Sequence, residues 1–290
     1  MIHSEDLLNK VLDKLVASTH SPRGRFSATS TYPILQHRLF GKRHLFLHRS
    51  IAAAAAIAIL CLAGWWGYQY NDADKLIAVY AQAEIQSIQL SDGTRITLNR
   101  YSKITYPKHF DKQRDIQLEG EAYFEVKHDS KRPFTVKTAN IEIKDIGTRF
   151  NVEAYRQSQH IKTTLIEGSI SVKSAAIHRT APIELKPGES ITWDKRNNLF
   201  SRQSNPLTAN TIAWRDGSFI FDNCPMGEVA ERLSNSFNTP ILLHDKKLAN
   251  YRINARFCHK EDLATILTVL QKAGHFDYKT LNKKIVLYKN

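Results

Sequence analysis

The chain has 290 residues, enough for about two domains, and a formal net charge of +13. Its basic residues are spread along the whole sequence, and no arginine-rich arm or aromatic RNP pattern occurs, so the charge does not indicate direct nucleic-acid binding. The 12 histidines and 3 cysteines show no metal-ligand spacing. We therefore expect no metal and no cofactor.

An apolar stripe runs along the first predicted helix, Glu5–Ala17, which Ser4 can cap. The stripe consists of Leu7, Leu8, Val11, Leu12, Leu15 and Val16. Residues 1–50 are too few to bury this stripe in a core of their own. It is predicted to dock on a partner protein, or alternatively to lie on the inner leaflet of a membrane.

The stretch Ile51–Tyr68 contains no charged residue and predicts a transmembrane helix, about 27 Å long at 1.5 Å per residue. Basic residues precede it and an aromatic belt ends it, so the positive-inside rule places residues 1–50 in the cytoplasm and residues 70–290 on the other side of the membrane. A signal peptide would have a shorter n-region, and a lipoprotein would have a small residue, not Leu60, before Cys61. A buried helix of a soluble protein is the remaining alternative. We expect a single-pass membrane protein, in contact with membrane lipid.

Residues 76–195 change to a period of two and predict an all-β domain. A hairpin is expected around Asp92-Gly93, and Asp115–Lys127 alternates between apolar and polar residues. Further strands are predicted at Pro133–Thr138, Ile141–Tyr155, Ile161–Lys173 and Ile183–Trp193.

Three carboxylates share one face of the Asp115–Lys127 strand, namely Glu119, Glu121 and Glu125. A glycosidase-like pair is one interpretation. The alternative, which we favour, is that they form the solvated side of the strand. The sequence contains no phosphate loop and no nucleophile motif, so we expect no enzyme.

Residues 196–213 are predicted to be a polar linker, and residues 214–290 a small α+β sandwich with the order β-α-β-β-α-β-β. Cys224 and Cys258 each stand where a strand ends and a helix begins. If those strands pair in parallel, a disulfide is within reach; otherwise the two are buried thiols.

Three segments between Leu90 and Tyr155 resemble the FecR (ferric-citrate regulator) family of transmembrane anti-sigma factors. They read LSDGTRITLNRYSKITYP, IQLEGEAYFEVKHDSKRPFTVKT and IGTRFNVEAY. The tail from Trp214, WRDGSFIFDNCPMGEVAERL, is similar to the C-terminal domain of such proteins and to the short N-terminal domains of secretins and TonB-dependent proteins (STN-like).

The resemblance implies a signalling relay across a bacterial inner membrane, with the N-terminus in the cytoplasm and the C-terminal domains in the periplasm. The cytoplasmic segment would bind an extracytoplasmic-function sigma factor, and the periplasmic end would contact the signalling domain of a TonB-dependent outer-membrane transducer, so that nutrient-uptake genes are transcribed. Family members usually carry a longer cytoplasmic helical domain than residues 1–50. The rival interpretation is a membrane-anchored periplasmic binding or scaffolding module without sigma-factor control.

Some members of the family cut themselves at a Gly-Thr bond, and Gly147-Thr148 falls in the matching IGTRF segment. The reaction would be attack of the Thr148 hydroxyl on the Gly147 carbonyl, followed by hydrolysis of the ester. The alternative is an ordinary turn before a strand.

Overall fold

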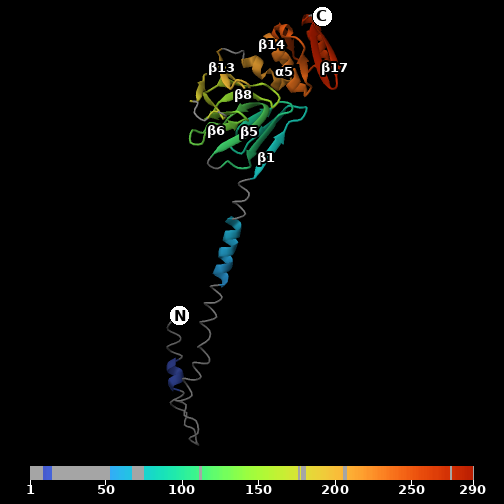
Figure 1. Ribbon diagram of the computed structural model, residues 1–290. Coiled ribbons are helices and arrows are strands. Elements are labelled where there is room, and N and C mark those ends of the chain that lie inside the picture. The colour runs from blue at the N-terminus through green and yellow to red at the C-terminus, as the bar shows by residue number, and fades with distance from the viewer. Residues whose placement is uncertain are drawn as a thin grey trace. The chain divides into compact units, whose positions relative to one another are not determined.

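A computed structural model describes residues 9–14, 53–66, 75–110, 113–175, 177, 181–204, 208–274 and 276–289 (Figure 1). The chain divides into two compact units, Met1–Asn71 and Asp72–Asn290. The described part of the first unit consists of two helices, at residues 9–14 and 53–66.

Within the described residues, no helix combines the length and the apolar character that crossing a membrane requires. Many of the described residues of the second helix, 53–66, are alanines, which add little to insertion. The prediction of a single membrane-spanning helix over Ile51–Tyr68, and of a single-pass membrane fold, is therefore wrong.

The second unit begins with a β domain that is built on one long strand, β5 (Arg114–Glu125). The other strands are β1 (Leu76–Tyr80), β2 (Gln86–Gln89), β3 (Arg95–Leu98), β4 (Lys103–Pro107), β6 (Phe134–Lys137), β7 (Ile141–Asp145), β8 (Arg149–Ala154), β9 (His160–Glu167), β10 (Ile170–Ser174), β11 (Ile183–Leu185), β12 (Glu189–Asp194) and β13 (Leu199–Ser204). The expected hairpin is present, because β2 and β3 pair antiparallel around Gly93.

Strand β5 belongs to two sheets. Its first half pairs with β4 and β6 in a first sheet of order β11-β10-β7-β6-β5-β4-β1. Its second half pairs with β3 and β8 in a second sheet of order β2-β3-β5-β8-β9-β12-β13. The partner strands change at Gly120, whose φ of 104° is readily adopted by glycine and strained for other residues.

One apolar core fills the β domain. Alternate residues of β5 enter it as expected, including Ile116, Leu118, Ala122 and Phe124. Phe124 stacks on Phe150 of β8 with 4.9 Å between the ring centroids.

The segment predicted as a linker, residues 196–213, is largely ordered structure. Leu199–Ser204 is β13, which pairs with β12, and the Phe200 ring packs 4.6 Å from that of Trp193. Helix α4 (Thr208–Ile212) and the 3-10 helix η1 (Ala213–Asp216) follow.

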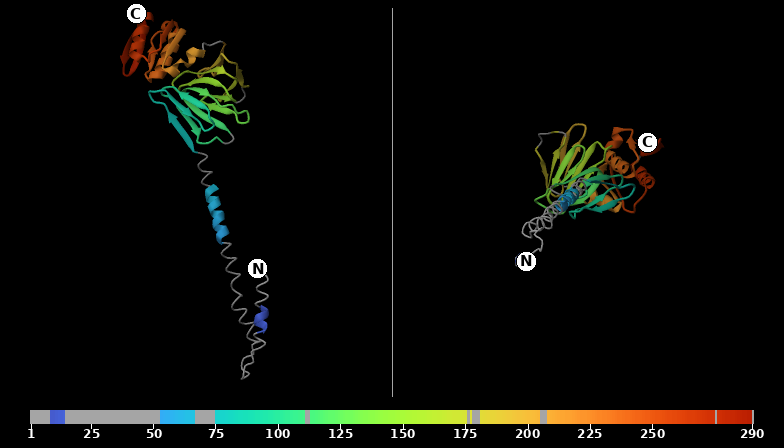
Figure 2. Two further views of the ribbon diagram at one scale, coloured as in Figure 1. Left: turned by 180° about the vertical axis from the view of Figure 1, so that it is seen from behind. Right: turned by 90° about the horizontal axis from the view of Figure 1, so that it is seen from below.

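The C-terminal domain has its own apolar core. Its elements are β14 (Phe219–Pro225), α5 (Met226–Phe237), β15 (Ile241–Leu243), α6 (Lys246–Asn250), β16 (Arg252–Phe257), α7 (Leu263–Gly274), β17 (Phe276–Leu281) and β18 (Lys284–Lys289). This is the predicted β-α-β-β-α-β-β order with the short helix α6 added. Strands β14 and β16 form one sheet, and β15-β18-β17 forms another. Figures 1 and 2 show these orange and red elements packed beside the β domain.

A Cys224–Cys258 disulfide depended on the prediction that the two strands pair in parallel. This prediction is wrong, because β14 and β16 run antiparallel. Cys224 lies opposite Ile253, whereas Cys258 follows Phe257, which lies opposite Phe219 at the other end of the ladder. Both cysteines are free thiols; Cys224 is buried and Cys258 is exposed. Burial raises the pKa of the Cys224 thiol to about 12, so this thiol is unreactive at neutral pH.

Candidate functional site

The outer face of the second sheet carries polar side chains where they would ordinarily meet water. Two ladders cross it, because residues paired in register point to the same side. One ladder runs Glu121–Glu153–Lys162, and the next runs Tyr123–Asn151–Thr164–Ser190. We call these residues the polar face.

The C-terminal segment covers the polar face. Trp214 Nε1 donates to Asn151 Oδ1 at 3.2 Å, and the Arg215 guanidinium lies 4.2 Å from the centroid of the Tyr123 ring. The polar face is therefore an interface inside the second unit, in which Asn151, Thr164 and Ser190 are at most 2% exposed.

Glu121 is buried in this interface and is 8% exposed. Its carboxyl oxygens accept hydrogen bonds from Asn99 Nδ2 at 2.7 Å and from Asn151 Nδ2 at 2.8 Å. Burial, together with the charge of neighbouring Glu153, raises the pKa of Glu121 to about 8. The prediction that Glu121 belongs to a solvated face is wrong, although Glu119 is exposed as predicted.

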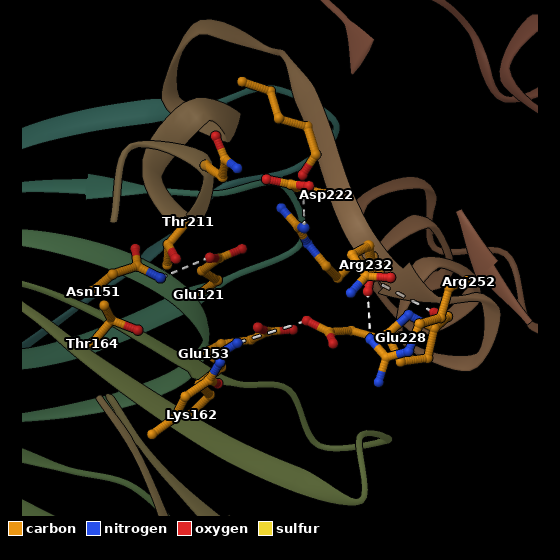
Figure 3. Close-up of a pocket in the computed structure, with 16 residues that line it drawn as sticks. Glu121, Asn151, Glu153, Lys162, Thr164, Thr211, Asp222, Glu228, Arg232 and Arg252 are labelled. Carbon is orange, nitrogen blue, oxygen red and sulfur yellow. Dashed lines mark hydrogen bonds and ion pairs between the residues drawn. The ribbon is translucent and has the colours of Figure 1, made fainter. Parts of the chain in front are cut away.

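A cavity of about 380 Å³ adjoins Glu121 between the polar face and the C-terminal domain (Figure 3). Its wall on the β domain includes Glu121, Asn151, Glu153, Lys162 and Thr164. Its opposite wall includes Asp222, Cys224, Glu228, Arg232 and Arg252. Burial also raises the pKa of Glu153, although Arg232 and Lys162 act to lower it.

The cations of the cavity have partners of their own. Lys162 Nζ lies 3.6 Å from Glu228 Oε1 across the two walls. Arg232 donates to the Ile220 carbonyl at 3.3 Å, and Arg252 donates to the Asn223 carbonyl at 2.5 Å. The cavity thus holds two adjacent carboxyl groups without a direct cationic partner among the described residues.

No glycosidase-like pair forms from the three carboxylates of β5. Glu119 and Glu121 line two different cavities. Glu125 forms an ion pair with Arg149, whose Nε lies 3.6 Å from Glu125 Oε1. Within the described ranges, no group of three or more His, Cys, Asp or Glu side chains is arranged to hold a metal ion.

The Gly147-Thr148 bond lies in the tight connection between β7 and β8. Gly147 has a φ of 146°, and a Cβ there would lie 2.6 Å from His128 Nδ1, so only glycine fits. Thr148 is 4% exposed, and Asp145 Oδ1 accepts from the Gly147 amide at 2.9 Å. Among the described residues, Thr148 Oγ1 and Asp145 Oδ2 form no hydrogen bond within normal geometry. Burial raises the pKa of Asp145, and the hydrogen bond from the Gly147 amide and the interaction with the Thr148 hydroxyl partly offset this.

The predicted partner-binding stripe is described only in part. Val11 and Leu12 lie on the helix at residues 9–14 and are 51% and 37% exposed. The other members, Leu7, Leu8, Leu15 and Val16, lie outside the described residues.

Sequence reasoning missed the polar face because nothing local distinguishes it from a solvated face. Alternating polar residues on β5, β8 and β9 have the same pattern whether water or a second domain covers them. The cover comes from Trp214, which is 63 residues from its partner Asn151 in the sequence.

Comparisons with known proteins agree with this architecture. The FecR protein family model matches residues 78–171, and the model for the C-terminal domain of FecR matches residues 218–287. Among curated proteins, none matches this chain. Two crystal structures of a candidate anti-sigma factor from Parabacteroides distasonis ATCC 8503 match with a TM-score of 0.65 and 26% sequence identity. Each covers 74% of this chain, and the matches cover 100% and 99% of the chains in those structures.

Proposed function

This chain belongs to the FecR family, and we propose that it is an anti-sigma factor, a protein that regulates transcription by binding a sigma factor. The observation that carries the proposal is the order of two family domains in one compact unit. Support also comes from a structural relative named as a candidate anti-sigma factor, which matches over 74% of this chain.

The finer part of the proposal concerns the partners. The sigma factor would belong to the extracytoplasmic-function class, and the signal would come from the signalling domain of a TonB-dependent transducer. The proposed contact for the sigma factor is the apolar stripe, of which Val11 and Leu12 are exposed. Exposed apolar side chains that recur on one helix face are typical of a surface that docks on a partner.

A binding assay with two matched variants tests this contact. Leu12→Asp places a charge in the stripe, and Lys10→Gln changes the net charge by the same amount on the opposite face of the same helix. We expect Leu12→Asp to weaken capture of the co-expressed sigma factor at least tenfold and Lys10→Gln to leave capture unchanged. Equal capture by both variants would place the contact elsewhere, and no capture by the unaltered chain would contradict the anti-sigma role.

The transducer part is tested separately. A purified protein spanning residues 75–289 should bind the isolated signalling domain of the transducer encoded nearby, as measured by calorimetry. An unrelated transducer's signalling domain serves as the control, and equal binding of both would contradict a specific relay.

We propose no turnover of a substrate, but the geometry at Gly147-Thr148 favours one intramolecular reaction. The Thr148 hydroxyl would attack the Gly147 carbonyl while Asp145 accepts its proton, and the amide nitrogen of Thr148 would leave as an amine. Water would then hydrolyse the ester between Gly147 and the Thr148 oxygen. The buried Thr148 hydroxyl, which interacts with the Asp145 carboxyl, supports this proposal.

Mass spectrometry of the purified chain tests the reaction. Cleavage should produce a fragment that begins at Thr148, and Thr148→Ala should abolish it, while Thr138→Ala serves as a control in the same domain. Recovery of only full-length chain would contradict self-cleavage without affecting the anti-sigma proposal.

A further inference from the structure

The cavity beside the polar face contains two carboxyl groups that oppose each other across neighbouring strands. Glu121 of β5 pairs in register with Glu153 of β8. Like charges in such a position are destabilising unless a cation or a proton compensates them. Glu121 is bonded to the side-chain amides of Asn99 and Asn151, and neither carboxylate forms an ion pair within the described part of the chain.

A third group in the cavity lacks a partner. Thr164 is 1% exposed, and its Oγ1 has no hydrogen bond to any described residue. Figure 3 shows the hydroxyl directed into the cavity, on the same wall as Glu121 and Glu153. A buried hydroxyl without a hydrogen bond costs free energy, so this group indicates a missing ligand atom.

We propose that this cavity binds a small molecule that carries a protonated primary amine. An ammonium group has three N–H donors, and the wall offers three acceptors in Glu121, Glu153 and Thr164. On binding, the ammonium group would take the place of the proton that the two carboxyl groups otherwise hold. The cavity volume of about 380 Å³ is that of a small-molecule site. Lys162 pairs with Glu228, and the two arginines donate to backbone carbonyls. Arg232 therefore acts on Glu121 and Glu153 only through space, and no ion pair among the described residues occupies the position proposed for the ligand.

The ligand would touch both domains of the second unit, because Glu121 and Thr164 belong to the β domain and Arg232 and Glu228 belong to α5. Binding would therefore strengthen the interface between the two domains. This site is separate from the sigma-factor contact, so its test needs no sigma factor and does not depend on the proposed function.

Calorimetry of the purified full-length chain tests the site with ethanolamine, putrescine and lysine as amine probes. 1,4-Butanediol has the carbon chain of putrescine without its charges and serves as the uncharged control. We expect saturable binding of at least one amine and none of the diol. Absence of binding by all three amines, or equal binding of the diol, would overturn the proposal.

Three variants assign the binding to this cavity. Glu121→Gln should weaken the amine at least tenfold, and Thr164→Val should weaken it about fivefold, since each removes one acceptor and keeps the side-chain shape. Glu119→Gln changes the same residue type on the exposed part of β5 and should leave the affinity unchanged. Unchanged affinity in both cavity variants, with circular dichroism showing that they are folded, would overturn the assignment.

Discussion

At the scale of single residues, Arg114 shows how a charge is accommodated inside the β domain. The residue is 0% exposed, and its Nη1 lies 3.0 Å from Asp92 Oδ2. The guanidinium also donates to the carbonyls of Arg132 at 2.7 Å and Lys127 at 2.8 Å. Arg114 thereby ties the start of β5 to the β2–β3 turn and to the connection before β6.

Arg114→Met should therefore be strongly destabilising. The substitution keeps the apolar stem but removes the cationic partner of Asp92 and the guanidinium donors to the Arg132 and Lys127 carbonyls, which should cost about 3–5 kcal/mol in free energy of unfolding. Arg95 is exposed at the start of β3, so Arg95→Met is the matched control and should change stability by less than about 0.5 kcal/mol. Urea denaturation of both variants measures the difference, and equal midpoints would contradict the role assigned to Arg114.

Glu121 predicts a particular dependence of stability on pH. Its pKa is about 8 in the folded chain, above the ordinary 4.5, so between these values the folded state holds a proton that the unfolded state has lost. Stability should therefore fall as pH rises through this window, with a slope on the order of 1 kcal/mol per pH unit. Glu153 opposes Glu121 and contributes in the same direction, so the two titrate as a coupled pair.

The measurement is urea denaturation of the unaltered chain and of Glu121→Gln at pH 5, 6, 7 and 8. Glu121→Gln should flatten the slope because glutamine does not ionise, and Glu119→Gln should retain it. If stability rose with pH, or if Glu121→Gln left the slope unchanged, burial would not be what sets the pKa of this carboxyl group.

At the scale of elements, β5 can leave one sheet for the other because Gly120 permits close contact with Ser102. A Cβ at Gly120 would lie 2.4 Å from Ser102 Oγ and 2.6 Å from Ser102 Cα. Ser102 Oγ in turn accepts a hydrogen bond from the Glu121 amide at 2.8 Å. The glycine thus positions the very residue that faces the cavity.

Gly120→Ala should lower the free energy of unfolding by more than about 3 kcal/mol, since it adds a backbone clash to an unfavourable φ. Gly93→Ala separates the two effects, because Gly93 has a φ of 88° but no atom within 4 Å of the added Cβ. It should cost only about 1 kcal/mol. Thermal unfolding followed by circular dichroism gives both values, and equal losses would mean that the contact with Ser102 is not limiting.

The elements with a clear period were predictable from the sequence. The apolar stripe of α5 packs Met226, Val229, Ala230 and Leu233 into the C-terminal core, as its helical spacing predicts. The division of β5 between two sheets was not predictable, because the alternation of apolar and polar residues continues unchanged through Gly120 while the partner strands change. The short helix α6 carries no repeat long enough to be recognised.

At the scale of the whole second unit, two apolar cores meet through a polar interface. The core of the β domain and that of the C-terminal domain are separate clusters. Between them lie hydrogen bonds such as Asn235 Nδ2 to Ser158 Oγ at 2.9 Å, and the Arg100 guanidinium, which lies 5.7 Å from the centroid of the Phe237 ring. No single sequence pattern encodes an interface whose two sides are about 50 or more residues apart, and this is why the burial of Glu121 could not be read from β5 alone.

Because the interface is polar, we expect the β domain to fold without the C-terminal segment that covers it. Its stability should then no longer depend on pH in this way. A protein spanning residues 75–204 retains the whole core of the β domain but lacks Trp214 and Arg215, which cover the polar face. Water would then reach Glu121 and return its pKa toward 4.5, so the fall in stability between about pH 5 and 8 should largely disappear. Urea denaturation of this protein and of residues 75–289 across that range makes the comparison. An equal slope in both proteins would mean that the sheet alone buries Glu121, and that the C-terminal domain neither raises its pKa nor closes the cavity beside it.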